Sequence, residues 1–418
     1  MGCSKNLVDS ESLLGQLQLS KADLTDSADD ADTIVINTCG FIESAKQESI
    51  DAILEAVERK KKGELKKIVV MGCLTERFKS ELMQEIPEVD VFFGSNSMKE
   101  VVEELGADFK KELLGERLLT TPSHFAYLKI SEGCDNPCSF CAIPLMRGTH
   151  RSKPVELVLA EARSLAVKGV KELILIAQDS TYYGLDLYGE RRLARLLRAL
   201  TTVDGIEWIR LMYAFPARFP LEILDVFHES PKLCRYMDVP VQHASDDVLK
   251  SMRRGITNRG TREILGTIRE KIPGIALRTT LIVGYPNETE KDFQLLNDFV
   301  REMKFHRLGV FTYSQEEGTT AFPLSDPIPQ NVKEERRDIL MELQREISEE
   351  RNQNKIGTTV KVLIDAASDG GFVGRTEWDA PEIDQEVVIQ TKDHLVPGSF
   401  CNVRIDDATE YDLYGHVS

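Results

Sequence analysis

Hydrophobic and polar positions follow a different pattern in each of three consecutive stretches of this chain. In residues 1–118, short apolar runs rich in β-branched residues alternate with longer runs of helical periodicity. The expected strands are 33–37, 67–71 and 89–93, and the expected helices are 42–62 and 75–86. Strands separated by helices form parallel sheets, so this stretch predicts a flavodoxin-like α/β domain.

The second stretch, residues 124–353, repeats a strand followed by a helix six times. The expected strands are 126–130, 172–177, 206–213, 235–241, 275–283 and 306–313. The amphipathic helices between them include 155–168, 190–200, 259–271 and 289–304, and a charged helix over 331–354 follows the last strand. Six parallel strands predict a partial (β/α)6 barrel, whose functional residues should lie at the C-terminal ends of the strands.

The third stretch, residues 355–418, contains short strands separated by Gly, Pro and Asp. The expected strands are 359–365, 371–377, 386–390, 399–405 and 412–417. Five short strands at this spacing predict a small antiparallel barrel of the OB-like type. The chain of 418 residues is therefore expected to be an α/β protein with three domains.

Charge is unevenly distributed over these stretches, although the whole chain carries a net −17. Residues 1–120 contain 15 Lys and Arg against 24 Asp and Glu, and residues 355–418 contain 5 against 12. The region between them is close to neutral. Nucleic-acid binding depends on clustered Lys and Arg, so we expect no direct nucleic-acid binding and favour a basic protein partner. The alternative is that the acidic ends only keep the protein soluble.

The apolar runs are too short for a membrane protein. No run reaches the about 18 apolar residues of a membrane span, and the N-terminal residues lack the basic and apolar segments of a signal peptide. Eight cysteines in a chain of this length are typical of reduced thiols rather than of a small disulfide scaffold. We therefore expect a cytoplasmic protein with no membrane contact.

The most informative chemistry is the spacing of Cys134, Cys138 and Cys141, which is Cys-x3-Cys-x2-Cys directly after the first barrel strand. Three thiolates without a fourth can hold a 4Fe–4S cluster and leave one iron open to a ligand that is not protein. The alternative is a structural zinc site completed by a distant residue. Zinc normally takes four protein ligands in short pairs, and no second pair of that kind exists in the chain.

A second set of cysteines, Cys3, Cys39 and Cys73, is spaced one per strand–helix unit of the first stretch. Cys39 and Cys73 each follow an expected strand, and equivalent ends of neighbouring parallel strands converge in space. These thiols could therefore hold a second cluster. The alternative is that they are small buried hydrophobic residues, which is how we interpret Cys234 and Cys401.

Several motifs together resemble the radical S-adenosylmethionine (SAM) methylthiotransferases over the whole chain. They are Gly-Cys-Ser-Lys-Asn at 2–6, Asp-Ser-Glu at 9–11, Asn-Thr-Cys at 37–39, Gly-Cys at 72–73 and the run from Gly133 to Pro144. The resemblance implies an auxiliary-cluster domain at 1–118, a radical SAM barrel at 124–353 and a TRAM domain at 355–418. It also implies two 4Fe–4S clusters, SAM as a cofactor and an electron donor such as flavodoxin.

The implied chemistry begins with reductive cleavage of SAM to a 5′-deoxyadenosyl radical, which abstracts hydrogen from an unactivated carbon. The auxiliary cluster takes part in sulfur insertion, and a second SAM supplies the methyl group. Phe140 matches the aromatic position of the superfamily motif. By the same resemblance, Gln178, Gln242 and Gly284, which follow expected barrel strands, are candidate SAM contacts. Ordinary turn chemistry is the alternative for these strand ends.

Three further runs resemble the branch of the family that modifies an aspartate of small-subunit ribosomal protein S12. They are residues 3–9, residues 141–149 and residues 313–319, the last of which carries the pair Glu316 and Glu317. The acidic third stretch agrees with a basic ribosomal protein as substrate. The alternative branch modifies an adenosine of tRNA. We expect the two glutamates near the mouth of the site, with an exposed loop as the alternative.

One departure from the family concerns the start of the chain, because family members have a short strand before the first cysteine. We therefore expect the first sheet to lack an inner strand and Cys3 to lie on a frayed terminus. Two readings outside the family are an electron-transfer iron–sulfur protein, for which six cysteines suffice, and a nucleic-acid-binding module with a structural metal. Cleavage of SAM under reducing conditions would distinguish a radical SAM enzyme from an electron-transfer protein. Tight, salt-sensitive tRNA binding would favour the nucleic-acid-binding module.

Overall fold

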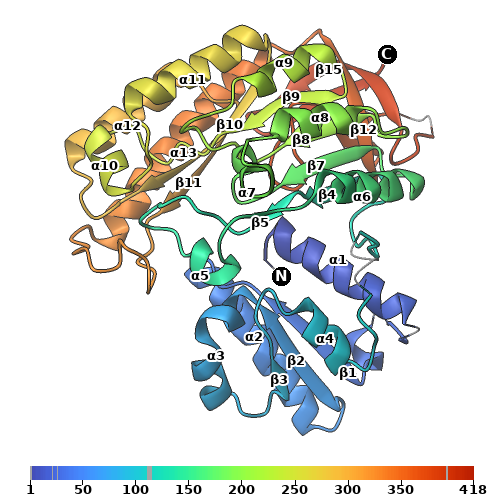
Figure 1. Ribbon diagram of the computed structural model, residues 1–418. Helices are drawn as coiled ribbons and strands as arrows, with labels where there is room; N and C mark the ends of the chain where they lie inside the picture. Colours follow the sequence, from blue (N-terminus) through green and yellow to red (C-terminus); the bar gives the residue numbers. More distant parts are fainter. Residues whose placement is uncertain (1, 21, 26, 111–114, 392–393) are drawn as a thin grey trace.

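A computed structural model describes residues 2–20, 22–25, 27–110, 115–391 and 394–418. In Figure 1 the N-terminal α/β unit lies below the six-stranded sheet, and the C-terminal strands, among them β12 and β15, lie beside that sheet near β7 and β8. The predicted α/β fold with a parallel first sheet, a partial barrel and a small C-terminal barrel is confirmed.

The N-terminal unit contains a parallel sheet of three strands in the order β1-β2-β3. Its elements are α1 (Ser4–Leu19), β1 (Thr33–Thr38), α2 (Glu43–Lys61), β2 (Lys67–Gly72), α3 (Cys73–Glu85), β3 (Val91–Phe92) and α4 (Met98–Glu104), with a 3-10 turn at Ala28–Asp30. Buried Ile53, Ile68 and Val70 form part of the core between the sheet and its helices. The described residues contain no strand before β1, as expected, but Met1 lies outside them.

The helix α1 was not predicted, and it changes the place of Cys3. Cys3 is the N-cap residue of α1, and its carbonyl oxygen accepts a hydrogen bond from the amide of Leu7 at 3.1 Å. The expectation that Cys3 lies on a frayed terminus was therefore wrong for the described residues. Cys3 is exposed, but it begins a helix that is buried along much of its length.

The barrel sheet has six parallel strands in the order β11-β10-β9-β8-β7-β4. Its strands are β4 (Phe125–Lys129), β7 (Glu172–Ile176), β8 (Trp208–Leu211), β9 (Leu233–Asp238), β10 (Ala276–Val283) and β11 (Arg307–Thr312). The main helices are α6 (Val155–Val167), α8 (Leu193–Thr201), α9 (Glu222–Glu229), α11 (Asn258–Lys271), α12 (Glu290–Met303) and α13 (Gln330–Gln353). Shorter helices are α5 (Ile143–Arg147), α7 (Leu185–Tyr188) and α10 (Asp246–Ser251), with a 3-10 turn at Ser180–Tyr182.

A two-stranded sheet of β5 (Ser131–Glu132) and β6 (Arg151–Ser152) closes the segment that carries Cys134, Cys138 and Cys141. The sequence did not predict this sheet. It holds both ends of the segment together directly after β4, so the three cysteines lie at the C-terminal end of the first barrel strand. This is the end of the barrel where functional residues are expected.

The C-terminal unit is a closed barrel of five strands in the order β12-β13-β14-β16-β15. These strands are β12 (Thr359–Ser368), β13 (Gly371–Arg375), β14 (Val387–Gln390), β15 (Phe400–Ala408) and β16 (Leu413–Val417). Leu363 and Ala380 of this unit belong to the same buried cluster as Tyr127, Ile174 and Tyr236 of the six-stranded sheet. The small barrel therefore closes the interior of the large one.

Charged residues hold the small barrel at the N-terminal ends of the large barrel's strands. Glu172, the first residue of β7, is fully buried between Arg210 at 2.7 Å and Arg375 at 2.8 Å. Arg375 also binds Asp365 at 2.7 Å, and Arg307 at the start of β11 donates to Asp379 at 3.0 Å. Several acidic groups of the C-terminal unit are thus neutralised within the protein and do not face a partner.

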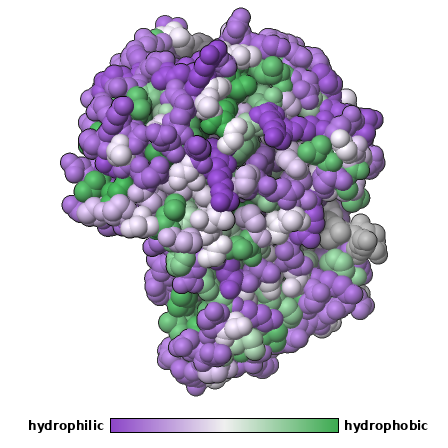
Figure 2. Space-filling model, turned by 60° about the vertical axis from the view of Figure 1, so that its left-hand side comes forward, coloured by the Kyte–Doolittle hydropathy of each residue, from purple (hydrophilic) through white to green (hydrophobic). Residues whose placement is uncertain are grey.

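No helix in the described ranges is long and apolar enough to cross a membrane. The face drawn in Figure 2 is mostly hydrophilic, with small hydrophobic groups scattered over it.

Candidate functional site

The cysteines of the first set lie in a tight turn between β5 and α5. The Cys134 amide donates to the Gly148 carbonyl at 3.1 Å, and the Cys141 amide donates to the Cys138 carbonyl at 3.2 Å. Gly133 has φ +75°, and a β-carbon there would lie 2.0 Å from the carbonyl oxygen of Thr149. Only glycine allows this close approach of the two backbone segments, which fixes the position of Cys134.

Burial favours the protonated form of two thiols of this set, Cys134 and Cys141. It raises the pKa of Cys134 to about 11 and that of Cys141 to about 12, and in both cases neighbouring thiols of the set add to the increase. The Asn136 amide group lies 3.5 Å from the Cys134 sulfur, and Arg254 Nη1 lies 3.2 Å from the Cys138 sulfur. The structure therefore brings the three sulfurs together beside hydrogen-bond donors. Thiolate binding to metal would release their protons.

The second set also converges, at the C-terminal ends of β1 and β2 and the N-terminus of α1. Burial raises the pKa of Cys39 and raises that of Cys73 to about 12, and Cys3 contributes to both increases. A β-carbon on Gly2 would lie 3.2 Å from the Cβ of Cys39. Cys3, Cys39 and Cys73 thus interact across 70 residues of sequence.

Each set consists of three free thiols. In the described ranges, no three His, Cys, Asp or Glu residues are close enough together to hold one metal ion. All eight cysteines are free, and the two that belong to neither set lie apart, Cys234 in the interior of the large barrel and Cys401 in the small barrel. Three converging thiols without a fourth cysteine suit a 4Fe–4S cluster with one open iron.

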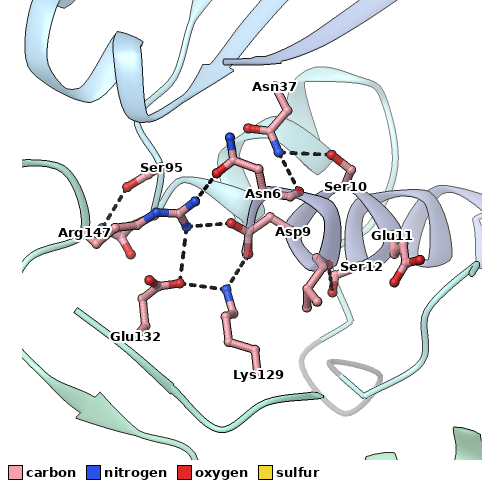
Figure 3. A network of polar contacts seen from close by, with 12 residues as sticks. Asn6, Asp9, Ser10, Glu11, Ser12, Asn37, Ser95, Lys129, Glu132 and Arg147 are labelled. Carbon is pink, nitrogen blue, oxygen red and sulfur yellow. Dashed lines mark hydrogen bonds and ion pairs between the residues drawn. The ribbon is translucent and has the colours of Figure 1, made fainter. Parts of the chain in front are cut away.

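A buried polar network connects the two sets (Figure 3). Arg147, at the end of α5, donates from Nε to the Cys73 sulfur at 3.2 Å and from Nη1 to Asp9 of α1 at 2.6 Å. Arg147 Nη1 also lies 3.3 Å from Glu132, two residues before Cys134, and Arg147 Nη2 donates to Asn6. Lys129 completes the network by donating to Asp9 and, at 2.7 Å, to Glu132.

The charges of this network stabilise each other. Burial disfavours the ionised form of Glu132, but the charges of Lys129 and Arg147 outweigh burial and lower its pKa to about 2. Burial also opposes the charge of Lys129, whereas Asp9 and Glu132 raise its pKa above the ordinary value. At neutral pH the network therefore holds two cations against two carboxylates.

A cavity of about 630 Å³ lies between the large barrel and the N-terminal unit. Phe140 and Ala142, which flank Cys141, line it together with Phe41 and Ile42, which follow Cys39. Gln242 also lines it, with φ +76° and a buried side-chain oxygen that has no partner among the described residues. An unpartnered buried amide and an aromatic ring beside the cysteine turn are suited to binding a polar organic cofactor. Phe140 and Gln242 thus line the same cavity.

The other two predicted SAM contacts are placed differently. Gln178 does not line this cavity; its side-chain nitrogen donates to Glu132 at 2.8 Å, and its buried side-chain oxygen is unpartnered among the described residues. Gly284 does not line it either. A β-carbon on Gly284 would lie 2.2 Å from Cγ of Lys333, so Gly284 allows α13 to pack closely against the end of β10.

Glu316 lines the cavity but is already paired. Its carboxylate accepts from Lys46 at 2.8 Å and from Arg77 at 2.9 Å, and Arg77 also donates to the Glu317 carbonyl at 2.9 Å. The two glutamates do lie near the mouth of the site. Glu316 holds the N-terminal unit against the barrel, however, and only Glu317 is exposed.

The sequence motifs include Asp9 and Arg147 without indicating a role for either residue, and they do not include Arg254. No spacing rule assigns them a role, because the contacts Arg147–Cys73, Arg147–Asp9 and Arg254–Cys138 each join residues more than 60 positions apart. One feature of the sequence could have identified Arg147, because this residue follows the last cysteine of the first set by six residues.

Comparison with known proteins shows which families match this chain. Residues 1–94 match the family model of the uncharacterized protein family UPF0004, residues 128–300 that of the radical SAM superfamily, and residues 356–417 that of the TRAM domain. The ribosomal protein uS12 methylthiotransferase RimO of Cytophaga hutchinsonii is 55% identical over 420 residues, which cover 100% of this chain and 96% of the relative. RimO of Flavobacterium johnsoniae is also 55% identical, over 99% of this chain and 96% of that protein.

The chain belongs to the RimO family. It is a radical SAM methylthiotransferase, and its cofactors are SAM and 4Fe–4S clusters, as predicted. The solved structure of the radical SAM methyltransferase TsrM from Kitasatospora setae, with cobalamin and a 4Fe–4S cluster bound, has a TM-score of 0.52 at 15% identity. That match covers 69% of this chain and 65% of TsrM and supports the fold alone.

Proposed function

We propose that this chain adds a methylthio group to the β-carbon of an aspartate in ribosomal protein uS12. The observation that carries the proposal is one cavity lined both by Phe140 and Ala142, which flank Cys141, and by Phe41 and Ile42, which follow Cys39. A radical generator and a separate sulfur-inserting centre would both have to border such a cavity. The RimO relatives, similar over the full chain, act on uS12 by name. No second acceptor is favoured by the geometry.

We assign Cys134, Cys138 and Cys141 to the cluster that binds SAM, and Cys3, Cys39 and Cys73 to the auxiliary cluster. When bound, these cofactors supply the reductive cleavage of SAM and the sulfur for transfer, which is chemistry that no side chain can perform. The role of the protein is to hold the clusters and SAM in position. Phe140 and Gln242 are the SAM contacts that the cavity supports best.

The remaining roles follow from this assignment. Residues 1–118 form the auxiliary-cluster domain, residues 124–353 the barrel that binds SAM, and residues 355–418 the TRAM domain that docks the substrate. Electrons must come from outside the chain, so we infer a reduced electron-transfer protein such as flavodoxin as a partner. A ribosomal substrate places the reaction in the cytoplasm.

Substrate choice rests on the exposed charge of the protein as well as on its relatives. Several acidic groups of the C-terminal unit are used against barrel arginines, but the chain still carries a net −17. Such a surface repels the phosphates of tRNA and attracts a basic ribosomal protein.

The cluster assignment is tested by counting iron after anaerobic reconstitution. We expect about eight irons per chain, because each 4Fe–4S cluster holds four. Changing all of Cys3, Cys39 and Cys73 to Ser should remove half of the iron and stop methylthio transfer, while SAM is still cleaved. Changing Cys134, Cys138 and Cys141 to Ser should remove the other half and stop SAM cleavage. The matched control Cys234→Ser should keep both clusters, and equal iron in all four proteins would contradict the assignment.

A further inference from the structure

Arg147 is buried, with 2% of its surface exposed, and it contacts both halves of the site. Its Nε points at the sulfur of Cys73, while Nη1 and Nη2 are taken by Asp9 and Asn6 of α1. If Arg147 needed only charge neutralisation, the carboxylates of Asp9 and Glu132 would be sufficient partners. The contact between Nε and the sulfur is additional, and it is directed at one cysteine.

We propose that Arg147 is a positioning residue that raises the reduction potential of the auxiliary cluster through its N–H donor to Cys73. The proposal rests on the assignment of Cys3, Cys39 and Cys73 to that cluster. Hydrogen bonds to ligand sulfurs and local charge are among the factors that set the potential of iron–sulfur clusters. A donor with positive charge stabilises the reduced, more negative cluster more than the oxidised one.

The charges around Arg147 determine whether it raises or lowers the reduction potential of the auxiliary cluster. Asp9 and Glu132 offset the charges of Arg147 and Lys129, so the four groups together carry no net charge and can remain buried. The cationic edge of the guanidinium nevertheless faces the sulfur, and the carboxylates lie on its other side. Removing the donor should therefore lower the potential, whereas removing the charge of Asp9 should raise it.

Arg254 provides a matched control at the other set. It is 3% exposed, and its Nη1 lies 3.2 Å from the sulfur of Cys138, while Nη2 donates to the Pro240 carbonyl. Each three-cysteine set thus has one buried arginine that donates to one sulfur. The two arginines should affect different clusters.

The experiment measures midpoint potentials by spectroscopic redox titration of proteins with a single cluster. In the variant with Cys134, Cys138 and Cys141 all changed to Ser, iron counting first establishes that the auxiliary cluster is present. Failure at that step contradicts the cluster assignment and is distinct from failure of the inference about Arg147. In that background, Arg147→Lys should shift the reduction equilibrium at least tenfold toward the oxidised form, about 59 mV for a one-electron couple. Arg254→Lys should leave the potential unchanged.

A second variant keeps the test decisive if Arg147→Lys fails to hold the cluster. Asp9→Asn retains the arginine and removes one counter-charge, so the potential should move in the opposite direction. Potentials that stay unchanged in both variants, or that move in the same direction, would overturn the proposal. In the reciprocal protein, with Cys3, Cys39 and Cys73 changed to Ser, Arg254→Lys should lower the potential of the remaining cluster.

Discussion

Single side chains at this site do more than the cysteine spacing indicates. Gly133 allows the cysteine turn to close. Gln242 adopts a left-handed conformation, φ +76°, and its amide oxygen at the cavity has no partner among the described residues. For a residue other than glycine such a conformation costs about 1–3 kcal/mol, and it is concentrated at ligand sites. The backbone strain therefore supports Gln242 as a ligand contact independently of any motif.

Gly284 gives a prediction at the residue scale. Gly284→Ala introduces a β-carbon 2.2 Å from Lys333 Cγ at φ +72°, so it should lower the free energy of unfolding by about 2–5 kcal/mol. Thermal unfolding of the cluster-free protein measures this. Gly189→Ala is the control, because Gly189 has the same φ of +72° and open space around its β-carbon, and it should cost about 1 kcal/mol. Equal costs for both variants would show that Lys333 moves away freely.

What could be predicted at this scale was the grouping of six cysteines into two sets of three, because their spacing along the chain separates them from Cys234 and Cys401. The donors around them could not be predicted. Arg147 and Arg254 reach their sulfurs from 74 and 116 residues away along the chain, and an arginine in a sequence is most often a solvated surface residue.

At the scale of elements, the strands and long helices followed from periodicity, whereas α1 did not. Lys5, Asn6, Asp9, Glu11 and Gln16 are all buried in α1. The helix lies between the N-terminal sheet and the large barrel, so polar residues occupy faces that are normally apolar. The amphipathic pattern that identifies a surface helix is therefore absent. The strands β5 and β6 were not predicted for a different reason. Each is two residues long, which is too short to show an alternating pattern of apolar and polar residues.

The contact between β7 and the small barrel gives a prediction about an element. Glu172 is fully buried between two arginines, so Glu172→Gln should lower the free energy of unfolding by about 3–5 kcal/mol at pH 7. Chemical denaturation of the cluster-free protein measures the loss. Glu222→Gln on the exposed side of α9 is the control and should change it by less than about 0.5 kcal/mol.

The same contact predicts a dependence on pH. Burial opposes ionisation of Glu172, but Arg375 and Arg210 hold its pKa below the ordinary value of 4.5. A lowered folded-state pKa adds stability above the unfolded-state pKa, and this stability is lost as pH falls through the folded-state value. The unfolding free energy of the wild-type protein should therefore decrease below about pH 4.5 more steeply than that of Glu172→Gln. Parallel curves for the two proteins would contradict this account.

At the scale of the whole molecule, the site exists only because the N-terminal unit is docked onto the barrel. Glu316 accepts from Lys46 and Arg77 across this junction. Glu316→Gln should weaken docking by about 1–3 kcal/mol, because it leaves half-buried Arg77 without its carboxylate and leaves Lys46 with Glu43 alone. Faster hydrogen–deuterium exchange in α2 and α3 would report the loss. The neighbouring Glu317→Gln is the control and should exchange like the wild type, and an equal effect of both changes would show that the ion pairs do not hold the junction.

Charge at this scale could be predicted from the sequence only in part. Counting residues gave acidic ends, but it could not show that Asp365 and Asp379 face arginines inside the protein. Nor could it show that the small barrel sits at the ends of the strands opposite the cysteines. Pairing between domains depends on the three-dimensional arrangement, whereas net charge depends on composition alone.

The central claim is that this chain transfers a methylthio group to uS12. The most direct measurement incubates the reconstituted protein anaerobically with SAM, a reductant, purified uS12 and bulk tRNA, and analyses both products by mass spectrometry. We expect one aspartate of uS12 to carry a methylthio group in place of a hydrogen, with the tRNA unmodified. A methylthio-modified adenosine in the tRNA, together with unmodified uS12, would contradict it.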